Sequence, residues 1–338
     1  MSRPPQDAPR TDPASSESRT AWTRYWQAGA LHSCATSFSG NYEGPIADFW
    51  RRVFAGLVAG DRVLDVASGN GPLAKLLIET RAEPSITCDC VDLAPVAPEW
   101  LNALPPVQRD RVRFFGHTRA EALPFDRGRH ALAISQFGLE YSTLSESMPE
   151  LLRVLARPAR VAAVVHHADS RPVRLAAEEL RHIEWVLQAD GLVASARAML
   201  RPMAQAGTEA GRRALASDTA ALQMRERFNA QQRLLSDRAA TSLCPDLLFE
   251  LRAAIASALE IARSRGEAAG HDALQGIEQA VRDDRARLDD MQRAAMDETG
   301  LRSALRLLGE QARHEVAPIE HAGHLMGWSV LVALPGPG

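Results

Sequence analysis

Short β-branched runs alternate with helical segments between Asp61 and about Ala168, and this alternation restricts the fold more than any other feature of the sequence. Strands are predicted at 62–66, 86–93, 112–116, 131–136 and 161–165, and helices at 72–80 and 148–155. Strands joined by helices build a parallel α/β sheet that is covered on both faces. The final apolar run, 328–334, is predicted to return to this sheet as one more strand.

The regions on either side of this segment differ from it in composition. Residues 1–20 are rich in proline, serine and charge, and we expect a disordered tail. Residues 21–60 are expected to be helical and to act either as core packing or as a lid over a ligand. Their aromatic cluster comprises Trp22, Tyr25, Trp26, Phe38, Tyr42, Phe49 and Trp50. Residues 171–313 have an almost purely helical pattern, so we expect a helical insertion within a sheet domain of 61–170 and 314–338.

Two apolar patterns stand out in the helical block. Leu248, Leu251, Ile255 and Leu259 follow the spacing of one helix face. A second, heptad-like seam consists of Leu274, Ile277, Val281, Leu288, Met291 and Ala295. This seam has two interpretations, which are packing within the chain and pairing of two chains into a homodimer.

Charge and cysteine content exclude several classes of function. The formal net charge is −3, and Lys75 is the single lysine among 39 basic residues, so we expect no nucleic-acid partner and no membrane association. No apolar stretch approaches the roughly 20 residues of a membrane span. The four cysteines, which are Cys34, Cys88, Cys90 and Cys244, are too few for disulfides to stabilise a chain of this length. This favours a cytoplasmic location. His321 and His324 lack a supporting ligand cluster, so no metal is predicted.

The segment Val63–Ala74 carries the strongest chemical signal, because it joins a buried strand to a glycine turn and a helix start. Gly69 and Gly71 can adopt positive φ and allow a close approach to the backbone. Asp92 ends the second strand, where a carboxylate can accept both hydroxyls of a ribose. A cofactor that contains a nucleoside is therefore predicted. The candidate residues of these two turns are Asp65, Ala67, Ser68, Gly69, Asn70, Gly71, Asp92 and Leu93.

The glycine pattern alone also fits a dinucleotide site, so a nicotinamide-dependent oxidoreductase is an alternative. Asp65 favours a different cofactor, because a carboxylate at the end of the first strand suits the ammonium and sulfonium of S-adenosyl-L-methionine better than a pyrophosphate. Here the sequence resembles the class I S-adenosylmethionine-dependent methyltransferases, whose first motif is an acidic residue followed by a Gly-x-Gly turn. The resemblance implies a Rossmann-like sheet with an antiparallel last strand. A non-catalytic methyltransferase-like scaffold is the remaining alternative.

Two further segments extend the resemblance. The run 119–125, which contains Ala120 and Glu121, is similar to the family segment that lines the adenine. Arg119 stands where the family usually has an acid. Because arginine can only donate hydrogen bonds, we do not expect its side chain to accept one from the adenine amino group, as the acid would. The run 135–141 resembles the segment beside the methionine moiety, which makes Gln136 a cofactor-binding candidate. Tyr25 and Trp26 of the lid are further candidates, since aromatic faces attract a sulfonium.

The alignment of the acceptor with the methyl group contributes most to the rate of methyl transfer. A hydroxyl or amine acceptor also needs a base to remove its proton. Candidates must lie at the carboxyl ends of the strands, where open α/β sheets bind ligands. Glu140 and Tyr141 follow the fourth strand, His166 follows the fifth, and His32 belongs to the lid. His166 and its neighbour His167 are expected to face opposite ways. The predicted acceptor is a small molecule, apolar or aromatic. Methylation on oxygen or nitrogen is favoured, and methylation on carbon is left as an alternative.

Overall fold

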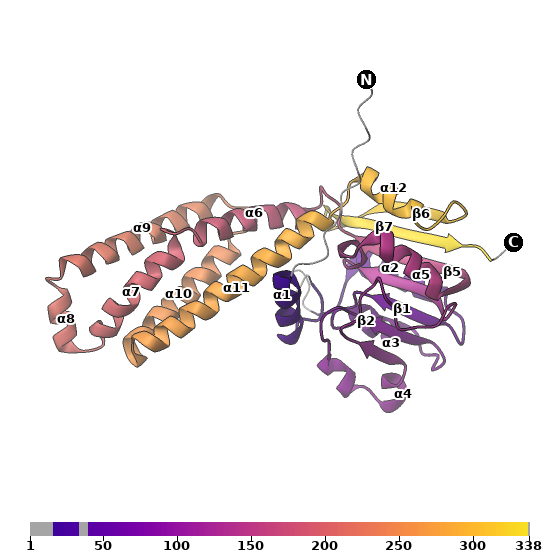
Figure 1. Ribbon diagram of the computed structural model, residues 1–338, viewed down its shortest axis with the longest axis horizontal. Helices are drawn as coiled ribbons and strands as arrows, with labels where there is room; N and C mark the ends of the chain where they lie inside the picture. The colour runs from indigo at the N-terminus through magenta and orange to yellow at the C-terminus, as the bar shows by residue number, and fades with distance from the viewer. Residues whose placement is uncertain (1–15, 34–39, 337–338) are drawn as a thin grey trace, which may run out of the picture. The chain divides into compact units, whose positions relative to one another are not determined.

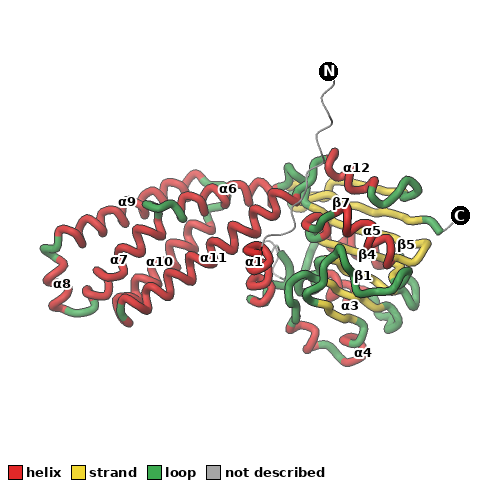
Figure 2. Tube along the Cα trace, viewed as in Figure 1, coloured by secondary structure: helices red, strands yellow, loops and turns green. Residues whose placement is uncertain are grey.

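The computed structural model describes residues 16–33 and 40–336 and divides into two compact units. One unit comprises Met1–Val173 with Asp290–Gly338, and the other comprises Arg174–Asp289. The first contains the sheet and the second is helical, as the ribbon in Figure 1 and the colouring of Figure 2 show. Cys34, Phe38 and residues 1–15 of the expected tail lie outside the described residues.

The sheet has seven strands in the order β3-β2-β1-β4-β5-β7-β6. The strands are β1 (Arg62–Val66), β2 (Thr87–Val91), β3 (Val112–Phe115), β4 (His130–Gln136), β5 (Leu155–Val165), β6 (Arg313–His321) and β7 (His324–Leu334). β1 to β5 pair in parallel, whereas β7 is antiparallel to β5 and to β6. This arrangement confirms the predicted Rossmann-like α/β fold with an antiparallel last strand.

Helices cover both faces of this sheet. The helices of the sheet unit are α1 (Ser16–Gln27), α2 (Gly44–Ala55), α3 (Pro72–Thr80), α4 (Pro106–Arg109), α5 (Leu144–Val154) and α12 (Glu298–Arg306). Two short 3-10 helices, η1 (Glu99–Ala103) and η2 (Leu139–Tyr141), complete it. α2 and α3 share one core with alternate strand residues, while α5 and α12 share the core of the opposite face. Successive strand residues point to opposite faces, so β1 supplies Val63 to the first core and Leu64 to the second.

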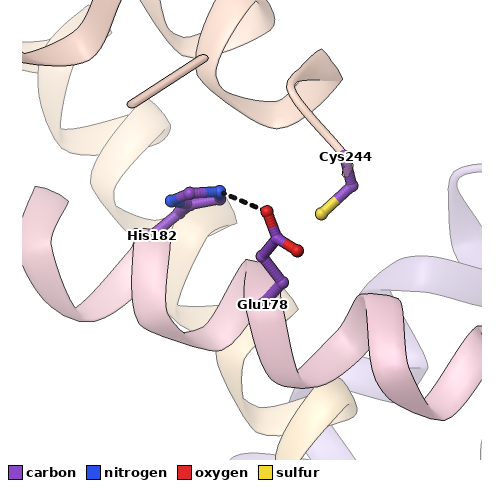
Figure 3. Close-up of side chains that lie close together, drawn as sticks. All are labelled: Glu178, His182 and Cys244. Atoms are coloured by element: carbon purple, nitrogen blue, oxygen red, sulfur yellow. Dashed lines mark ion pairs between the residues drawn. The ribbon is translucent and has the colours of Figure 1, made fainter. Parts of the chain in front are cut away.

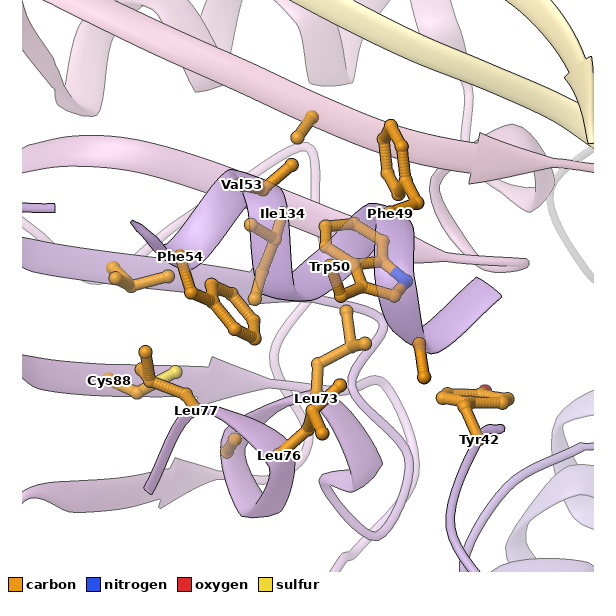
Figure 4. Close-up of a cluster of buried hydrophobic side chains, with 14 of the residues drawn as sticks. Tyr42, Phe49, Trp50, Val53, Phe54, Leu73, Leu76, Leu77, Cys88 and Ile134 are labelled. Atoms are coloured by element: carbon orange, nitrogen blue, oxygen red, sulfur yellow. The ribbon is translucent and has the colours of Figure 1, made fainter. Parts of the chain in front are cut away.

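The core beneath α2 and α3 consists of large apolar side chains that interlock (Figure 4). Trp50 and Phe54 of α2 are fully buried, and they pack with Leu73 and Leu77 of α3 over Ile134 of β4. Burial of each such side chain contributes roughly 1.5–3 kcal/mol relative to exposure. The Trp50 indole N–H also requires a partner, and it donates to the Gln136 side-chain oxygen at 2.5 Å. This bond holds the end of β4 in place.

Several boundaries differ from those predicted. Residues 16–20 were expected in a disordered tail, but they are helical, because α1 begins at Ser16, with Glu17 in its first turn and Ser18 and Ala21 buried. β6 was not predicted, since most of its residues are exposed and its sequence lacks the alternation of a half-buried strand. It is an edge strand that β7 recruits by pairing. α12 was expected within the helical block but lies in the sheet unit.

The second unit is built from α6 (Arg171–Val186), α7 (Leu192–Ala206), α8 (Glu209–Leu215), α9 (Thr219–Thr241), α10 (Asp246–Arg265) and α11 (Glu267–Ala294), the first and last of which also extend into the sheet unit. The apolar face of α10 that the residue spacing predicted is confirmed. The four residues of this face, Leu248, Leu251, Ile255 and Leu259, are all buried. Leu274 and Val281 of α11 are buried in the same core. These two seam residues therefore pack within their own chain and are not available for the predicted dimer contact.

Among the described residues, no helix is long and apolar enough to cross a membrane. Cys88, Cys90 and Cys244 are buried free thiols.

Candidate active site

The carboxyl ends of β1, β2 and β4 meet at one edge of the sheet, because these strands pair in parallel and in register. Two adjoining pockets lie there. The main pocket is lined by Arg19, Trp22, Trp26, Ala67, Val91, Asp92, Leu93, Ala94, Thr118, Arg119, Ala120, Glu121, Phe137, Gly138, Glu140, Tyr141, Ser142, Asp290, Arg293 and Ala294. The inner pocket is lined by Trp22, Trp26, His32, Ser33, Tyr42, Asp65, Ala67, Ser68, Pro72, Leu73, Gln136 and Phe137. The two pockets share four side chains, which are those of Trp22, Trp26, Ala67 and Phe137.

The glycine turn after β1 has the predicted left-handed backbone, with φ of 52° at Gly69 and 71° at Gly71. The close approach that these glycines permit is made by aromatic rings of the chain itself. A Cβ on Gly69 would lie 2.6 Å from the Trp26 indole, and one on Gly71 would lie 2.5 Å from the Phe114 ring. Neither Gly69 nor Gly71 lines either of the two pockets. The absence of a Cβ at both positions is therefore required by this packing, and their contact with a ligand stays a prediction.

The segment before the sheet is hydrogen-bonded to this turn. The Asn70 side-chain amide donates to the carbonyl oxygens of Trp26 at 2.9 Å and Ala30 at 2.7 Å. Asn70 thus anchors the segment that precedes the sheet, and it lines neither pocket. Tyr25 was expected to contact the cofactor, but it lines neither pocket. Its hydroxyl donates to the His32 carbonyl at 3.0 Å, so it stabilises the bend that follows α1.

Asp92 connects the second strand to the glycine turn. One carboxylate oxygen accepts the Gly69 N–H at 2.7 Å and the other accepts the Ala94 N–H at 2.8 Å. Burial raises the pKa of Asp92 to about 6, although these two N–H donors oppose the rise. A carboxylate has about four acceptor sites, so Asp92 can hold the turn and still accept hydroxyl groups from the main pocket.

Two buried polar atoms in the inner pocket lack partners among the described residues. Asp65 is 1% exposed and its Oδ2 atom accepts no hydrogen bond. The Gln136 amide nitrogen donates none, although the amide oxygen is held by Trp50. Burial raises the pKa of Asp65 well above its usual range, and the nearby Asp92 carboxylate adds to the rise. Buried polar groups are normally paired, so an acceptor and a donor left open in one pocket indicate a ligand that supplies both partners.

The outer wall of the main pocket follows β2 and β3. Leu93 is 40% exposed and offers an apolar surface directly after Asp92. Ala120 lies on the same wall. Arg119 is half-exposed and lies 3.5 Å from the Glu121 carboxylate, which also accepts the Thr143 N–H at 2.8 Å. The Arg119 side chain is thus directed by Glu121 at the rim of the pocket.

The structure brings two of the candidate catalytic residues into direct contact. Glu140 is 1% exposed, and its Oε1 atom accepts both the His166 backbone N–H at 3.0 Å and a bond from His166 Nδ1 at 2.8 Å. Its Oε2 atom has no partner among the described residues. Glu140 and Tyr141 line the main pocket, whereas His166 does not. His167 contacts a different group, since its ring stacks on Trp328 with centroids 4.3 Å apart.

His32 lies in the inner pocket and is buried. Its ring stacks on Tyr42 at 4.9 Å, and its Nε2 atom lies 3.0 Å from the Gly40 carbonyl oxygen. Burial lowers the pKa of His32, while the Gly40 contact opposes that effect. These contacts attach the lid segment to the core.

Asp290 was not predicted as a site residue. It is buried at the end of α11, lines the main pocket and accepts hydrogen bonds from Ser18 and, at 3.1 Å, from the Trp22 indole. Arg293 pairs with the same carboxylate. Asp290 looks like any solvated charge on a helix in the sequence, so no local signal distinguishes it.

No protein-family model matches the sequence, and no curated protein matches it. Solved structures that it resembles include geranyl diphosphate methyltransferase in complex with GPP and sinefungin (19% identity, TM-score 0.34, 41% of this chain and 52% of that one). Another is a SAM-dependent methyltransferase from Aquifex aeolicus (20% identity, TM-score 0.30, 37% of this chain and 66% of that one). A third is the [4+2]-cyclase SpnF (19% identity, TM-score 0.36, 46% of this chain and 62% of that one).

The matched part thus spans between half and two thirds of each of these structures. Their named activities differ, so the function is argued from the site residues of this chain. The sheet order with its antiparallel β7 shows a Rossmann-like fold.

Proposed function

We propose that this protein is an S-adenosylmethionine-dependent methyltransferase that acts on a small molecule. The observation that carries the proposal is the pair of unpartnered buried atoms in the inner pocket, Asp65 Oδ2 and Gln136 Nε2. An amino-acid moiety has an ammonium that suits the carboxylate and a carboxylate that suits the amide N–H. The methionine end of S-adenosylmethionine is such a moiety.

The carboxylates of the site support this cofactor over a dinucleotide. Asp65, Asp92 and Glu140 are all buried next to the two pockets. A pyrophosphate placed among them would face like charges, which disfavours the nicotinamide alternative. A sulfonium and an ammonium would instead be attracted. The aromatic faces of Trp22 and Trp26, which line both pockets, add cation–π attraction for the sulfonium.

The remaining residues divide between the parts of the cofactor. Asp92 would accept the ribose hydroxyls, and Leu93 with Ala120 would pack against the adenine. Ser68 and Ala67 would line the passage between ribose and methionine. An apolar or aromatic acceptor would occupy the space beside Tyr141 and Phe137, whose rings face the main pocket wall. The cytoplasmic location and the absence of a nucleic-acid partner stay predictions from the sequence.

S-adenosylmethionine would supply an electrophilic methyl group and leave as S-adenosylhomocysteine. Glu140 is the group placed to receive the proton that an acceptor oxygen or nitrogen loses, because it lines the pocket and its Oε2 atom is open. His166 is a positioning residue in this proposal, since its backbone N–H and its ring Nδ1 hold Oε1 and so fix the orientation of the carboxylate. The proposed reaction is therefore O- or N-methylation with Glu140 as the general base.

Isothermal titration calorimetry tests the cofactor assignment. S-adenosylmethionine is expected to bind about tenfold more weakly at about pH 5 than at about pH 7.5, because the ribose hydroxyls that donate to Asp92 favour its ionised form, and the pKa of Asp92 is about 6. The direction of this pH dependence follows from linkage. Below its pKa Asp92 holds a proton in the free protein, and binding of the cofactor must remove that proton, which lowers the affinity. NAD⁺ is the control and is expected not to bind. Tight binding of NAD⁺ without binding of S-adenosylmethionine would contradict the proposal.

The Glu140→Gln variant tests the base. We expect kcat to fall about 10²- to 10⁴-fold, the usual contribution of a general base, and the affinity for S-adenosylmethionine to fall much less. His167→Gln is the matched control, because its ring stacks on Trp328 away from Glu140, and it should keep the wild-type rate. An undiminished rate in Glu140→Gln would remove Glu140 from the mechanism. Cofactor binding without turnover on any acceptor would favour the non-catalytic alternative.

A further inference from the structure

The helical unit contains a cluster of three potential metal ligands that the methyltransferase proposal does not use. Glu178 and His182 lie four residues apart on α6, so they share one helix face. Cys244 lies in the connection between α9 and α10. One ligand atom from each of the three lies within 4.8 Å of the others (Figure 3). In the described part of the chain this is the one group of three or more His, Cys, Asp or Glu residues with that geometry.

The three side chains are largely withdrawn from solvent. His182 is 6% exposed and Cys244 is 8% exposed. Leu243, next to Cys244, is 78% exposed, so the cluster lies just beneath the surface and an ion can reach it without opening the core. A buried thiol, imidazole and carboxylate at one point form an unusual set in a helical core, where apolar residues pack best.

A hydrogen-bond network already links these side chains. A purely structural role in this network is the alternative to metal binding. The Ser242 hydroxyl donates to Glu178 Oε1 at 2.5 Å and lies 3.0 Å from His182 Nε2. The Leu243 N–H donates to the same glutamate oxygen at 2.8 Å. The Cys244 thiol is weakly engaged, with the Leu175 carbonyl oxygen at 3.8 Å and the Ser242 hydroxyl at 3.9 Å, and His182 Nδ1 has no partner among the described residues. The network satisfies Glu178 and Ser242, whereas the thiol takes part in it through two long contacts.

We propose that Glu178, His182 and Cys244 bind a zinc ion that fastens α6 to the connection between α9 and α10. Thiolate, imidazole and carboxylate are the ligands that Zn²⁺ prefers, and three protein ligands with one water complete a tetrahedral site. Binding forms a Zn–S bond as the Cys244 thiol loses its proton to solvent, so it releases one proton. His182 binds through one ring nitrogen as the neutral imidazole. This site is independent of the proposed methyl transfer.

Metal titration of the full-length protein tests the site. The apo protein, prepared with a chelator, is expected to bind one Co²⁺ per chain with a near-ultraviolet thiolate-to-cobalt absorption band, and Zn²⁺ is expected to displace it. Cys244→Ser should lose the band and weaken Zn²⁺ binding at least about tenfold. Zn²⁺ should raise the melting temperature of the wild-type protein but not that of Cys244→Ser.

The chain offers a matched control for this experiment. Glu267 and His271 repeat the same spacing on α11, 3.8 Å apart and about half-exposed, without a cysteine. His271→Gln is expected to keep the cobalt band and the zinc affinity of the wild type, whereas His182→Gln should lose both. An absence of the thiolate band in wild-type protein, or equal binding by wild type and Cys244→Ser, would show that the cluster is only a hydrogen-bond network. Circular dichroism of the apo variants verifies that they fold.

Discussion

The Asp65→Asn variant is expected to bind S-adenosylmethionine at least about thirtyfold more weakly than the wild type and yet to unfold at a higher temperature. Removing one partner of a buried charge pair costs roughly 2–5 kcal/mol of binding free energy, which corresponds to at least about thirtyfold in Kd. Asp65 Oδ2 has no partner among the residues that the structure describes, so the same substitution removes a buried carboxyl group that destabilises the fold. Calorimetry and thermal unfolding at neutral pH measure the two effects.

The gain in stability is expected to depend on pH. Because burial raises the pKa of Asp65 in the folded state above its value in the unfolded chain, the folded state binds the proton more tightly. The free energy of unfolding of the wild type therefore falls as pH rises from about 4 toward the folded-state pKa. Asn cannot ionise, so the advantage of the variant should be largest at neutral pH and should vanish below about pH 4.

Asp89 provides the matched control on the neighbouring strand. It is equally buried, but it is paired with Arg113 at 2.7 Å and His130 at 3.1 Å. Burial opposes ionisation, but these partners outweigh it and hold the pKa of Asp89 below its usual range. Asp89→Asn should therefore lower stability and leave cofactor affinity unchanged. If Asp65→Asn behaved like Asp89→Asn in both measurements, Asp65 would be a structural residue and the inner pocket would not hold the methionine moiety.

Removal of residues 1–33 is expected to abolish turnover, whereas removal of residues 1–15 is expected to leave it unchanged. The longer deletion removes α1, whose Trp22 and Trp26 line both pockets and stack with centroids 5.8 Å apart. Each indole contributes about 0.5–2 kcal/mol toward a nearby cation, and both exclude water from the reacting groups. Tyr42 is retained in this design because it is buried in the core beneath α2. Turnover and cofactor binding are measured after circular dichroism shows that the shorter chain folds.

The double substitution Trp22→Ala with Trp26→Ala gives the same test without shortening the chain. Tyr25→Phe is its control, since Tyr25 lines neither pocket and the substitution keeps the ring while it removes the hydroxyl that donates to the His32 carbonyl. We expect the double variant to lose affinity by about tenfold to several hundredfold and the control to lose little. A folded chain that lacks residues 1–33 and keeps the full rate would show that these rings are ordinary packing.

Local sequence signals predicted the first and last residues of some secondary-structure elements correctly. β1 and α3 begin and end where the pattern placed them, at Arg62–Val66 and Pro72–Thr80. The β-branched strand, the glycines with positive φ and a proline at the first helical position are all short-range effects, so the sequence displays them directly. β6 was missed because an exposed edge strand has no such pattern and exists only through its pairing with β7.

For the site, the sequence by itself determined which residues reach the carboxyl edge of the sheet: Asp65, Asp92, Gln136 and Glu140 all follow from strand positions. Only the tertiary structure decided what each one does there. Glu140 meets His166 across 26 residues and Trp22 meets Asp290 across 268, and the Trp26 ring occupies the face of Gly69 where a ligand was expected. The physical reason is that strand and turn formation depends on neighbours in the chain, whereas hydrogen-bond partners and burial depend on which distant segments pack together.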